Sequence, residues 1–426
     1  MKFLVVGGGG REHAIIKKLS ESEKVTKIYA APGNGGIAEL AECVSIKATD
    51  IPAMVDFAVE KQIDFCVVAP DDPLVLGMVD AMNEKGIPCF GPNKAAAIIE
   101  GSKAFSKDLM KKYGIPTAAY EIFDDPKKAI AYIEERNEFP VVVKADGLAL
   151  GKGVLICTTL AEAKAGVEEI MVDQKFGASG NQIVVEEFLT GPEVSVLSFT
   201  DGNVVVPMIS SMDHKRALDG DMGLNTGGMG TVAPNPYYTA EVAEQCMKEI
   251  FLPTIHAMNA EGRTFKGCLY FGLMLTPKGP KVIEYNCRFG DPETQVVLPL
   301  LKSDLAEIFI AVSEGRLADV KVEFESGAAA CVIMASGGYP TAYKSGYEMT
   351  GIADANALPD TYVYHAGSKL VDGKIVTAGG RVLGVTAKAD TLEEALKKAY
   401  HAVDCIHFTD AHYRKDIGKR ALLAGK

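Results

Sequence analysis

The first 90 residues alternate between short apolar stretches and amphipathic ones, and this alternation is the strongest constraint on the fold. Residues 2–6, 25–30, 64–68 and 87–90 are predicted to be buried strands, and helices are predicted between them. Strands that alternate with helices favour a doubly wound α/β domain, in which crossover helices join parallel strands. The chain therefore begins with such a domain, which we expect to cover residues 1–101.

The rest of the chain divides into two further predicted domains. Residues 102–325 mix strands with helices, and a compact unit at about 122–189 places a glycine-rich loop between two strands. A single long helix is predicted for residues 294–314. For residues 326–426 the pattern predicts a smaller α+β domain, in which several β segments come before a helix. A length of 426 residues accommodates three domains of ordinary size.

Composition excludes several classes of function. A net charge of −12 argues against duplex nucleic acid as a partner, because proteins that bind it carry a basic surface. The apolar start ends in glycines too early for a signal peptide, and no apolar run is long enough to cross a membrane. The nine cysteines form no C-x-x-C pair and the seven histidines no H-E-x-x-H motif. We therefore expect reduced thiols, a cytoplasmic location and no histidine metal site.

Gly7 to Gly10 form the first of two glycine-rich loops. They follow a strand and open a helix, an arrangement that aims backbone N–H groups at an anion. The dinucleotide fingerprint fails, because its third glycine position holds Glu12 or His13 and no acid ends the second strand. A NAD-dependent dehydrogenase is therefore disfavoured. A phosphate site and a tight turn without a ligand remain equally open for this loop.

The second glycine-rich loop, residues 147–153, lies between two strands. It has three residues between its glycines where the P-loop has four, and no helix follows it. Such a loop predicts a hairpin flap whose backbone amides cover phosphates and whose glycines allow movement. Lys144 and Lys152 stand at its two sides, although Lys152 alone could be a solvated loop charge.

The strand at residues 182–189 ends in two acids and two apolar residues. Its backbone can pair with the edge of an adenine while apolar side chains cover the ring, and Glu193 could hold ribose hydroxyls. The alternative is that these acids are simply solvated at a strand end.

Glu284, Asn286 and Arg288 occupy alternate positions and are predicted to share one face of a strand. Carboxylate and amide oxygens suit Mg²⁺, which also takes phosphate oxygens and water. The planar guanidinium suits phosphate or carboxylate oxygens. Together they predict a clamp for phosphoryl transfer, and the flap lysines favour this interpretation over a local Glu–Arg pair.

The order of these motifs resembles the ATP-grasp superfamily and, within it, the glycinamide ribonucleotide synthetases (phosphoribosylamine–glycine ligases). The similarity covers essentially the whole chain. It is carried by residues 7–14, 32–36, 144–154, 213–216, 225–230, 288–295, 413–418 and 420–422. The resemblance implies an N-terminal doubly wound parallel-sheet domain, an ATP-grasp domain with a mobile flap subdomain, and a C-terminal α+β domain.

The resemblance also implies an activity. Glycine is joined to 5-phosphoribosylamine through glycyl phosphate, with ATP as phosphoryl donor and Mg²⁺ or Mn²⁺ as the metal, in de novo purine biosynthesis. It further implies a monofunctional, cytoplasmic monomer that makes transient contact with neighbouring purine-pathway enzymes. Neither nucleic acid nor a membrane is an expected partner.

The resemblance assigns roles to residues of this chain. Glu284 and Asn286 are the metal ligands, and Arg288, Asp291 and Lys152 are catalytic, with Asp291 orienting or deprotonating an amine. ATP is bound by Lys107, Lys144, Gly151, Lys152, Gly153, Glu186, Glu187, Phe188, Leu189 and Glu193. The glycine and phosphoribosylamine pockets take Gly8, Gly9, Gly10, Asn34, Asp71, Asp213, Lys215, Asn225, Thr226, Gly227, Gly228 and Arg288.

The chain departs from the family pattern at a few positions. Residues 269–275 lack the second metal-binding acid that many ATP-grasp enzymes place there, so a second ion would rely on Asn286 and phosphate. Asp71 stands where a longer Glu is usual, Pro192 replaces an acid, and Leu150 and Leu224 replace smaller residues or Pro. The alternatives are another ATP-grasp enzyme, such as a purine-pathway carboxylase or formate-using transferase, and an ATP-binding regulator without turnover.

Overall fold

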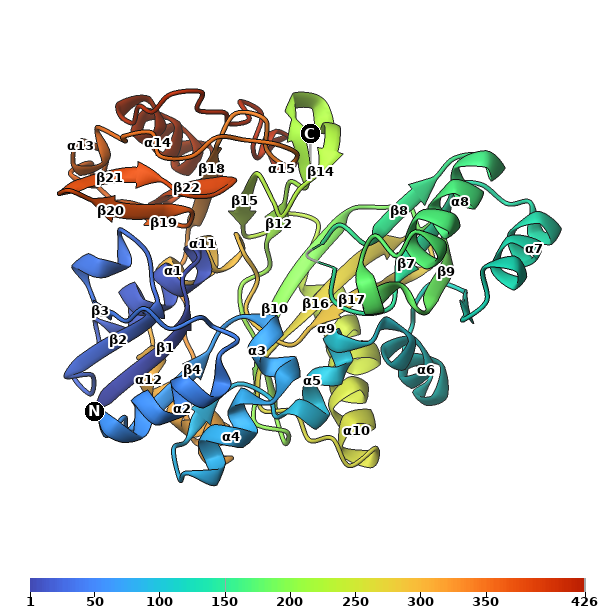
Figure 1. Cartoon of the computed structure of the whole chain (residues 1–426), viewed down its shortest axis with the longest axis horizontal. Helices are drawn as coiled ribbons and strands as arrows, with labels where there is room; N and C mark the ends of the chain where they lie inside the picture. Colours follow the sequence, from blue (N-terminus) through green and yellow to red (C-terminus); the bar gives the residue numbers. More distant parts are fainter. Residues whose placement is uncertain (150, 425–426) are drawn as a thin grey trace.

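The computed structural model describes residues 1–149 and 151–424, so Leu150 lies outside the described residues (Figure 1). The N-terminal part is a five-stranded sheet in the order β3-β2-β1-β4-β5, and every neighbouring pair is parallel. Its strands are β1 (Lys2–Gly7), β2 (Lys27–Pro32), β3 (Glu42–Cys43), β4 (Phe65–Val68) and β5 (Cys89–Phe90). Its helices are α1 (Gly10–Leu19), α2 (Ile51–Glu60), α3 (Asp71–Leu76) and α4 (Met78–Glu84). The predicted doubly wound fold is confirmed.

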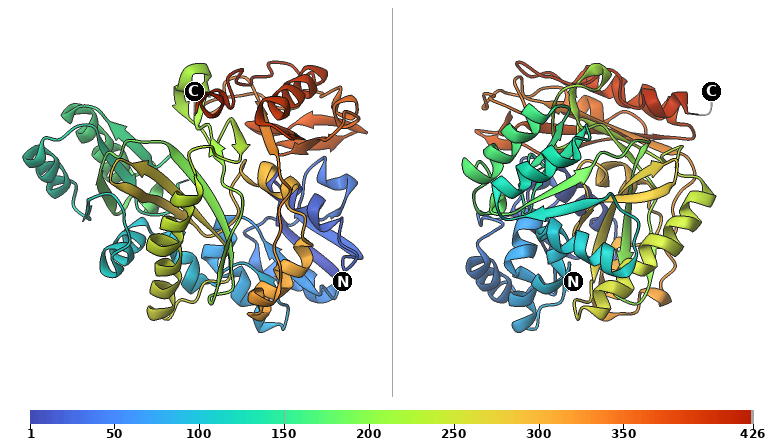
Figure 2. Two further views of the ribbon diagram at one scale, coloured as in Figure 1. Left: turned by 180° about the vertical axis from the view of Figure 1, so that it is seen from behind. Right: turned by 90° about the vertical axis from the view of Figure 1, so that its right-hand side faces the viewer.

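The middle part of the chain contains two separate four-stranded sheets. The flap sheet has the order β6-β9-β7-β8 and projects away from the N-terminal part (Figures 1 and 2). Its elements are β6 (Tyr120–Phe123), α7 (Pro126–Arg136), β7 (Val141–Ala145), β8 (Val154–Cys157), α8 (Leu160–Val167) and β9 (Ile183–Glu187). Strands β7 and β8 are antiparallel, so the predicted hairpin flap is confirmed.

The second sheet of the middle part has the order β11-β10-β16-β17. Its strands are β10 (Glu193–Thr200), β11 (Val205–Pro207), β16 (Gly267–Thr276) and β17 (Gly279–Asn286). The accompanying helices are α5 (Lys94–Gly101), α6 (Lys103–Tyr113), α9 (Ala240–Cys246) and α10 (Leu252–Ala260). A π-helical turn at residues 247–251 joins α9 to α10.

A fourth sheet, in the order β12-β15-β18-β22-β19, takes strands from both sides of the boundary predicted at 325/326. Its strands are β12 (Met212–Asp213), β15 (Gly230–Ala233), β18 (Ala328–Ala335), β19 (Thr361–His365) and β22 (Arg381–Ala389). Helices α13 (Ile352–Asn356) and α14 (Leu392–Cys405) pack beside it, and α15 (Lys419–Leu423) follows. Two small hairpins are β13 (Arg216–Leu218) with β14 (Met222–Asn225), and β20 (Ser368–Val371) with β21 (Lys374–Thr377).

The prediction of a single helix over residues 294–314 is wrong. The structure has a short helix α11 (Thr294–Val297), a 3₁₀ turn (Leu298–Leu300) and a separate helix α12 (Leu305–Glu314). Pro299 lacks the N–H that a continuous helix needs, and the Asp304 side chain accepts hydrogen bonds from the N–H groups of Ala306 and Glu307. The chain therefore starts a new helix instead of continuing the first one.

An aromatic cluster fixes the N-terminal part against the middle part. Phe90 of β5 stacks on Phe309 of α12 with ring centroids 3.9 Å apart, and Phe199 and Phe289 pack around them. All four rings are buried. Because Phe289 follows Arg288 directly, this cluster anchors the segment that carries the predicted clamp. Within the described residues, no helix has the length and apolar character needed to cross a membrane.

Candidate active site

Two buried lysines share one carboxylate at the base of the flap sheet. Lys107 of α6 and Lys144 of β7 each place Nζ 3.0 Å from a different oxygen of Glu186 on β9. The side chains of these three residues are 2–5% exposed. Burial lowers the pKa of Lys107 to about 8, although the Glu186 carboxylate opposes the shift. The Glu186 side chain thus holds the lysines, and only its backbone remains for the adenine contact predicted for it.

The other residues predicted to bind ATP lie along the flap and the end of β9. Glu187 accepts a hydrogen bond from the Ala119 N–H at 3.0 Å, and Phe188 is 37% exposed. Lys152 is exposed near the tip of the flap, while the Gly153 carbonyl accepts from Ala145 N–H at 2.8 Å and closes its base. The exposed side chains leave this edge open to a ligand.

Arg288 and Asn286 are both held by Glu100, a residue of α5. The Glu100 carboxylate forms an ion pair with Arg288 Nη2 at 2.9 Å, and it accepts hydrogen bonds from Asn286 Nδ2 at 2.9 Å and from the Cys287 N–H at 2.7 Å. Asp71 lies 3.8 Å from the same nitrogen of Arg288. Strand β17 ends at Asn286, so Arg288 lies past the strand rather than on its face.

The Arg288 side chain is 17% exposed, but its Nε is buried and incompletely bonded. Among the residues that the structure describes, none accepts a hydrogen bond from its Nε. A buried polar group without a partner is costly, and such groups are usually satisfied by a ligand or water. The position of Arg288 thus fits an anion that approaches it.

Glu284 and Asn286 fit one divalent cation. Burial alone would raise the pKa of Glu284, but Lys215, Lys144 and neighbouring cations outweigh it and lower the pKa. Because Asn286 donates its amide N–H to Glu100, its amide oxygen is turned away from that carboxylate. In the described part of the chain, no group of three or more His, Cys, Asp or Glu residues could hold a metal by itself. This donor set suits Mg²⁺-like ions, which take several ligands from phosphate and water.

A cavity of about 420 Å³ lies where the N-terminal glycine loop meets the five-stranded sheet that contains β22. Its walls include Gly8 and Gly9 on one side and Tyr339 and Arg381 on the other. Asn34 also lines it, but its amide donates to the carbonyls of Gly8 and His365 and accepts from the N–H groups of Gly36 and Ile37. All four hydrogen-bonding positions of the Asn34 side chain are occupied, so it holds the loop and is not free to bind a substrate.

Asp291 borders the same cavity and is surrounded by donors. It accepts from Arg11 N–H at 3.2 Å and from Gln295 Nε2 at 2.8 Å, and Arg381 lies 3.4 Å away. Burial would raise the pKa of Asp291, but Arg381 and Arg11 outweigh it and lower the pKa. A carboxylate in this setting is a poor base, and of the two predicted roles the geometry favours orientation of a substrate.

The loop from Asn225 to Gly230 is bonded to two residues that line the cavity, Tyr339 and Arg381. Thr226 Oγ1 donates to the Lys215 carbonyl at 2.8 Å and accepts from Gly228 N–H at 2.9 Å. Gly227 donates its N–H to Tyr339 Oη at 3.0 Å, and its carbonyl accepts from Arg381 at 3.0 Å. The C-terminal part of the chain therefore holds this loop from both sides.

Gly228 is packed against two other predicted site segments. A Cβ at this position would lie 2.5 Å from Pro292 and 2.7 Å from Asp213 Oδ1, and its φ of +125° disfavours any other residue. Burial, followed by the charge of Glu293, raises the pKa of Asp213 well above its usual range. The structure thus brings Asp213, Gly228 and the segment after Arg288 together.

Sequence reasoning missed three residues that hold the site: Glu100, Tyr339 and Arg381. Glu100 ends a helix and belongs to no motif, and it meets Asn286 across 186 positions of sequence. Arg381 follows two glycines and opens β22, but nothing in the adjacent sequence indicates its partners. A buried-acid pattern in α5, with Ile98 and Ile99 before Glu100, is the one signal that could have drawn attention to Glu100.

Comparison with known proteins identifies the family of the chain. Three family models of phosphoribosylglycinamide synthetase match the chain: the N domain at residues 1–100, the ATP-grasp (A) domain at 101–294 and the C domain at 329–420. A phosphoribosylamine–glycine ligase of Caldanaerobacter subterraneus is 49% identical over 98% of this chain and 99% of that protein. The crystal structure of a phosphoribosylamine–glycine ligase from Thermotoga maritima superposes with a TM-score of 0.84 at 33% identity, covering 98% of this chain and all of the other.

A more distant likeness concerns the fold alone. The biotin carboxylase domain of a 2-oxoglutarate carboxylase from Hydrogenobacter thermophilus, solved with MgADP and bicarbonate, gives a TM-score of 0.74 at 18% identity. The match covers 97% of this chain and 91% of that one. The three-part architecture is thus shared well beyond close relatives.

Proposed function

The chain belongs to the phosphoribosylglycinamide synthetase family and is an ATP-dependent ligase, and on this premise we propose how its residues carry out the reaction. The reaction joins glycine to 5-phosphoribosylamine and yields glycinamide ribonucleotide, ADP and phosphate, a step of de novo purine biosynthesis.

The chemistry requires activation of a carboxylate. The glycine carboxylate attacks the γ-phosphorus of ATP, ADP leaves, and glycyl phosphate forms. The amine of phosphoribosylamine then attacks the glycyl carbonyl, and phosphate departs as the amide bond forms. The protein supplies no covalent nucleophile in this sequence. It binds, orients and stabilises charge, which is the main contribution of proteins to phosphoryl transfer.

Arg288 carries the proposal. Its guanidinium is fixed by an ion pair with Glu100 at 2.9 Å, and its buried Nε has no hydrogen-bond acceptor among the described residues. In sequence, Arg288 follows the proposed metal ligand Asn286 by two positions. An anion that binds there gains a preorganised donor, whose desolvation is already offset by Glu100. We assign Arg288 to the γ-phosphoryl group and then to the acyl phosphate.

The lysines act on the same nucleotide. Lys107 and Lys144 are held by Glu186 and bind phosphate oxygens of ATP, and Lys152 adds a third charge when the flap covers them. The flap also excludes water, which would hydrolyse the acyl phosphate. Phe188, Leu189 and the β9 backbone frame the adenine, and Glu193 binds the ribose.

Glu284 and Asn286 are the proposed ligands of Mg²⁺ or Mn²⁺. Bound there, the ion would neutralise charge on the β- and γ-phosphate oxygens. The cavity beside Gly8, Gly9 and Arg381 takes the phosphoribosylamine, with Asp291 orienting it. Asp71 and the Asp213–Lys215 segment complete the substrate pockets.

The experiment measures ADP release with Mg²⁺-ATP, glycine and phosphoribosylamine formed in situ from ribose 5-phosphate and ammonia. Each component is omitted in turn, and Arg288→Ala is compared with Arg136→Ala, whose side chain is 43% exposed. We expect ADP to require both glycine and the amine, and to fall at least about 100-fold in Arg288→Ala only. ADP release that does not depend on glycine but does depend on another carboxylate would support an ATP-dependent ligase and would refute glycine as its substrate. Tight ATP binding without turnover would favour a regulator.

A further inference from the structure

Arg414 is the largest fully buried side chain among the described residues, and the chemistry above has no use for it. It belongs to the segment 412–420, which precedes and enters α15. Its guanidinium makes a bidentate pair with Asp416, at 2.8 Å and 2.9 Å, and Nη1 also donates to Asp221 Oδ1 at 2.9 Å. The same Nη1 donates to the Arg216 carbonyl at 3.1 Å. A buried arginine with this many partners fixes whatever carries those partners.

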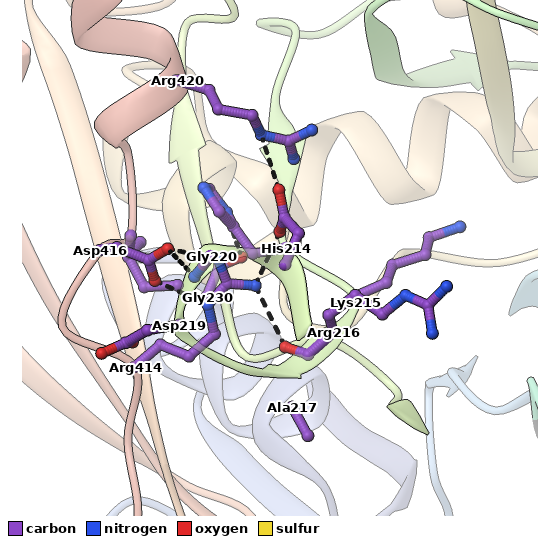
Figure 3. A network of polar contacts seen from close by, with 12 residues as sticks. His214, Lys215, Arg216, Ala217, Asp219, Gly220, Gly230, Arg414, Asp416 and Arg420 are labelled. Carbon is purple, nitrogen blue, oxygen red and sulfur yellow. Dashed lines mark hydrogen bonds and ion pairs between the residues drawn. The ribbon is translucent and has the colours of Figure 1, made fainter. Parts of the chain in front are cut away.

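Two of these partners, Arg216 and Asp221, lie on the hairpin of β13 and β14, whereas Asp416 belongs to the same segment as Arg414. At the tip of the hairpin, Gly220 donates its N–H to Asp416 at 2.8 Å, and Asp219 accepts from the Lys415 N–H at 2.8 Å. Gly220 and Asp221 have φ values of +70° and +55°, and the second is unfavourable for a non-glycine residue. The contacts to segment 412–420 hold this strained tip in place (Figure 3).

The same segment also fixes the residue that precedes Lys215. Gly418 donates its N–H to His214 Nε2 at 3.1 Å, so that nitrogen is unprotonated. His214 Nδ1 must then carry the proton and donates to the Gly230 carbonyl at 3.0 Å. Burial lowers the pKa of His214 to about 4, in agreement with a neutral ring. His214 and Arg216, on either side of Lys215, are therefore both held by segment 412–420.

Lys215 itself faces the site. Its side chain points away from Arg414 in Figure 3, and its Nζ lies 3.5 Å from Glu284 Oε1. Its carbonyl accepts hydrogen bonds from Thr226 N–H at 2.7 Å and from Thr226 Oγ1 at 2.8 Å. The backbone at Lys215 is thus fixed on both flanks, while the ammonium group reaches the proposed metal ligand.

We propose that segment 412–420 is a positioning element for the acceptor side of the active site, in which Arg414 acts through the β13–β14 hairpin to place Lys215. Lys215 then neutralises negative charge on glycine and on its acyl phosphate beside Glu284. The inference rests on the proposed function. It adds that the C-terminal segment, which touches no reacting atom, determines how well the carboxylate substrate is held.

The main test replaces Arg414 with Lys, which keeps one charge but lacks the planar fork that makes these bonds. We expect kcat/KM for glycine to fall about 10- to 100-fold, because small displacements of a binding group have effects of this size. The Kd for ATP, measured without glycine, should stay the same. Lys415→Ala is the matched control, because this exposed side chain is adjacent and only its backbone takes part.

A double-mutant cycle distinguishes positioning from a general loss of folding. In a Lys215→Ala background, Arg414→Lys should cause no further loss of kcat/KM for glycine, because its effect passes through Lys215. Losses that add, or an equal loss of ATP affinity, would overturn the proposal. If Arg414→Lys does not fold, Asp221→Asn at the partly exposed hairpin tip takes its place in the same cycle.

Hydrogen exchange gives a readout that does not depend on turnover. Amides of residues 216–225 should exchange faster in Arg414→Lys than in the wild type or in Lys415→Ala. Unchanged exchange would overturn the proposal even if activity fell. A wild-type protein that makes no glycinamide ribonucleotide would refute the proposed function, whereas the exchange experiment would still decide whether Arg414 holds the hairpin.

Discussion

Replacing Glu100 with Gln tests whether the arginine clamp depends on a residue outside every recognised motif. Glu100 accepts hydrogen bonds from Asn286 Nδ2 at 2.9 Å and from the Cys287 N–H at 2.7 Å, and it forms an ion pair with Arg288 at 2.9 Å. A glutamine has one acceptor oxygen with two lone pairs, and its NH₂ group would face a donor. At least one charge-assisted bond must therefore be lost.

The expected size of the effect follows from that loss. A hydrogen bond to a charged group contributes about 1.5–3 kcal/mol, and about 1.4 kcal/mol corresponds to a tenfold rate change. We expect kcat/KM for glycine to fall about 10- to 150-fold in Glu100→Gln. The Kd for ATP should change little, because Lys107 and Lys144 are held separately by Glu186.

The pH profile provides a second measurement on the same variant. Burial raises the pKa of Glu100 above its usual value, although Arg288 opposes the shift. As the pH falls through this raised pKa, the carboxylate gains a proton and releases Arg288, so wild-type activity should decline earlier than with an ordinary glutamate. That acid limb should be missing in Glu100→Gln.

Glu84→Gln is the matched control, since it makes the same chemical change at an exposed position of α4. ADP release is measured with varied glycine and saturating ATP for both variants and the wild type. Wild-type kcat/KM in Glu100→Gln, or an equal loss in Glu84→Gln, would refute the role assigned to the Glu100 carboxylate.

Three further predictions address other parts of the structure. Because the pKa of Lys107 is about 8, its charge is lost above that pH, and the Kd for ATP should rise by up to about tenfold per pH unit in titrations; Lys107→Arg, which stays charged, should flatten this rise. Gly228→Ala would place a Cβ 2.5 Å from Pro292 and should lower kcat/KM for glycine about 100-fold in steady-state assays. Gly262→Ala, with φ +68° and no atom within 4 Å, should leave that parameter unchanged, and equal losses would show that backbone strain alone is responsible. Phe309→Ala removes a buried ring stacked at 3.9 Å and should lower stability by about 3–5 kcal/mol in chemical denaturation, and a smaller loss than about 1 kcal/mol would contradict the anchoring role of the aromatic cluster.

Much of the architecture could be predicted because its signals are local. The strand–glycine–helix pattern at residues 2–19 and the hairpin around the flap depend on neighbours in sequence, and the structure has both. Lys144 follows three valines near the end of β7, so its burial agrees with the pattern, but its pairing with Glu186 could not be predicted. The predicted helix at 294–314 failed because a proline and an N-capping aspartate outweighed its apolar periodicity.

The candidate site was only partly predictable because its side chains are paired over long sequence distances. Glu100 meets Asn286, and Arg381 meets Asp291, only after the domains have packed together. A sequence motif names the residues that face a ligand but not those that hold them. Asn34 shows the reverse case: its motif is present, yet all its hydrogen bonds are internal.

The sheet that contains β15 and β18 has a consequence for the order in which parts of the protein can form during synthesis. Strand β15 pairs with β18, and the hairpin beside it is held by residues 412–420, which are synthesised nearly 200 positions later. The segments that we propose to hold the nucleotide lie between residues 103 and 288, so a nascent chain carries them all well before residues 412–420 are synthesised. The β13–β14 hairpin, in contrast, lacks its neighbours until residues 412–420 have been synthesised. The growing chain therefore contains the proposed ATP-binding residues before it contains the segment that we propose to position Lys215.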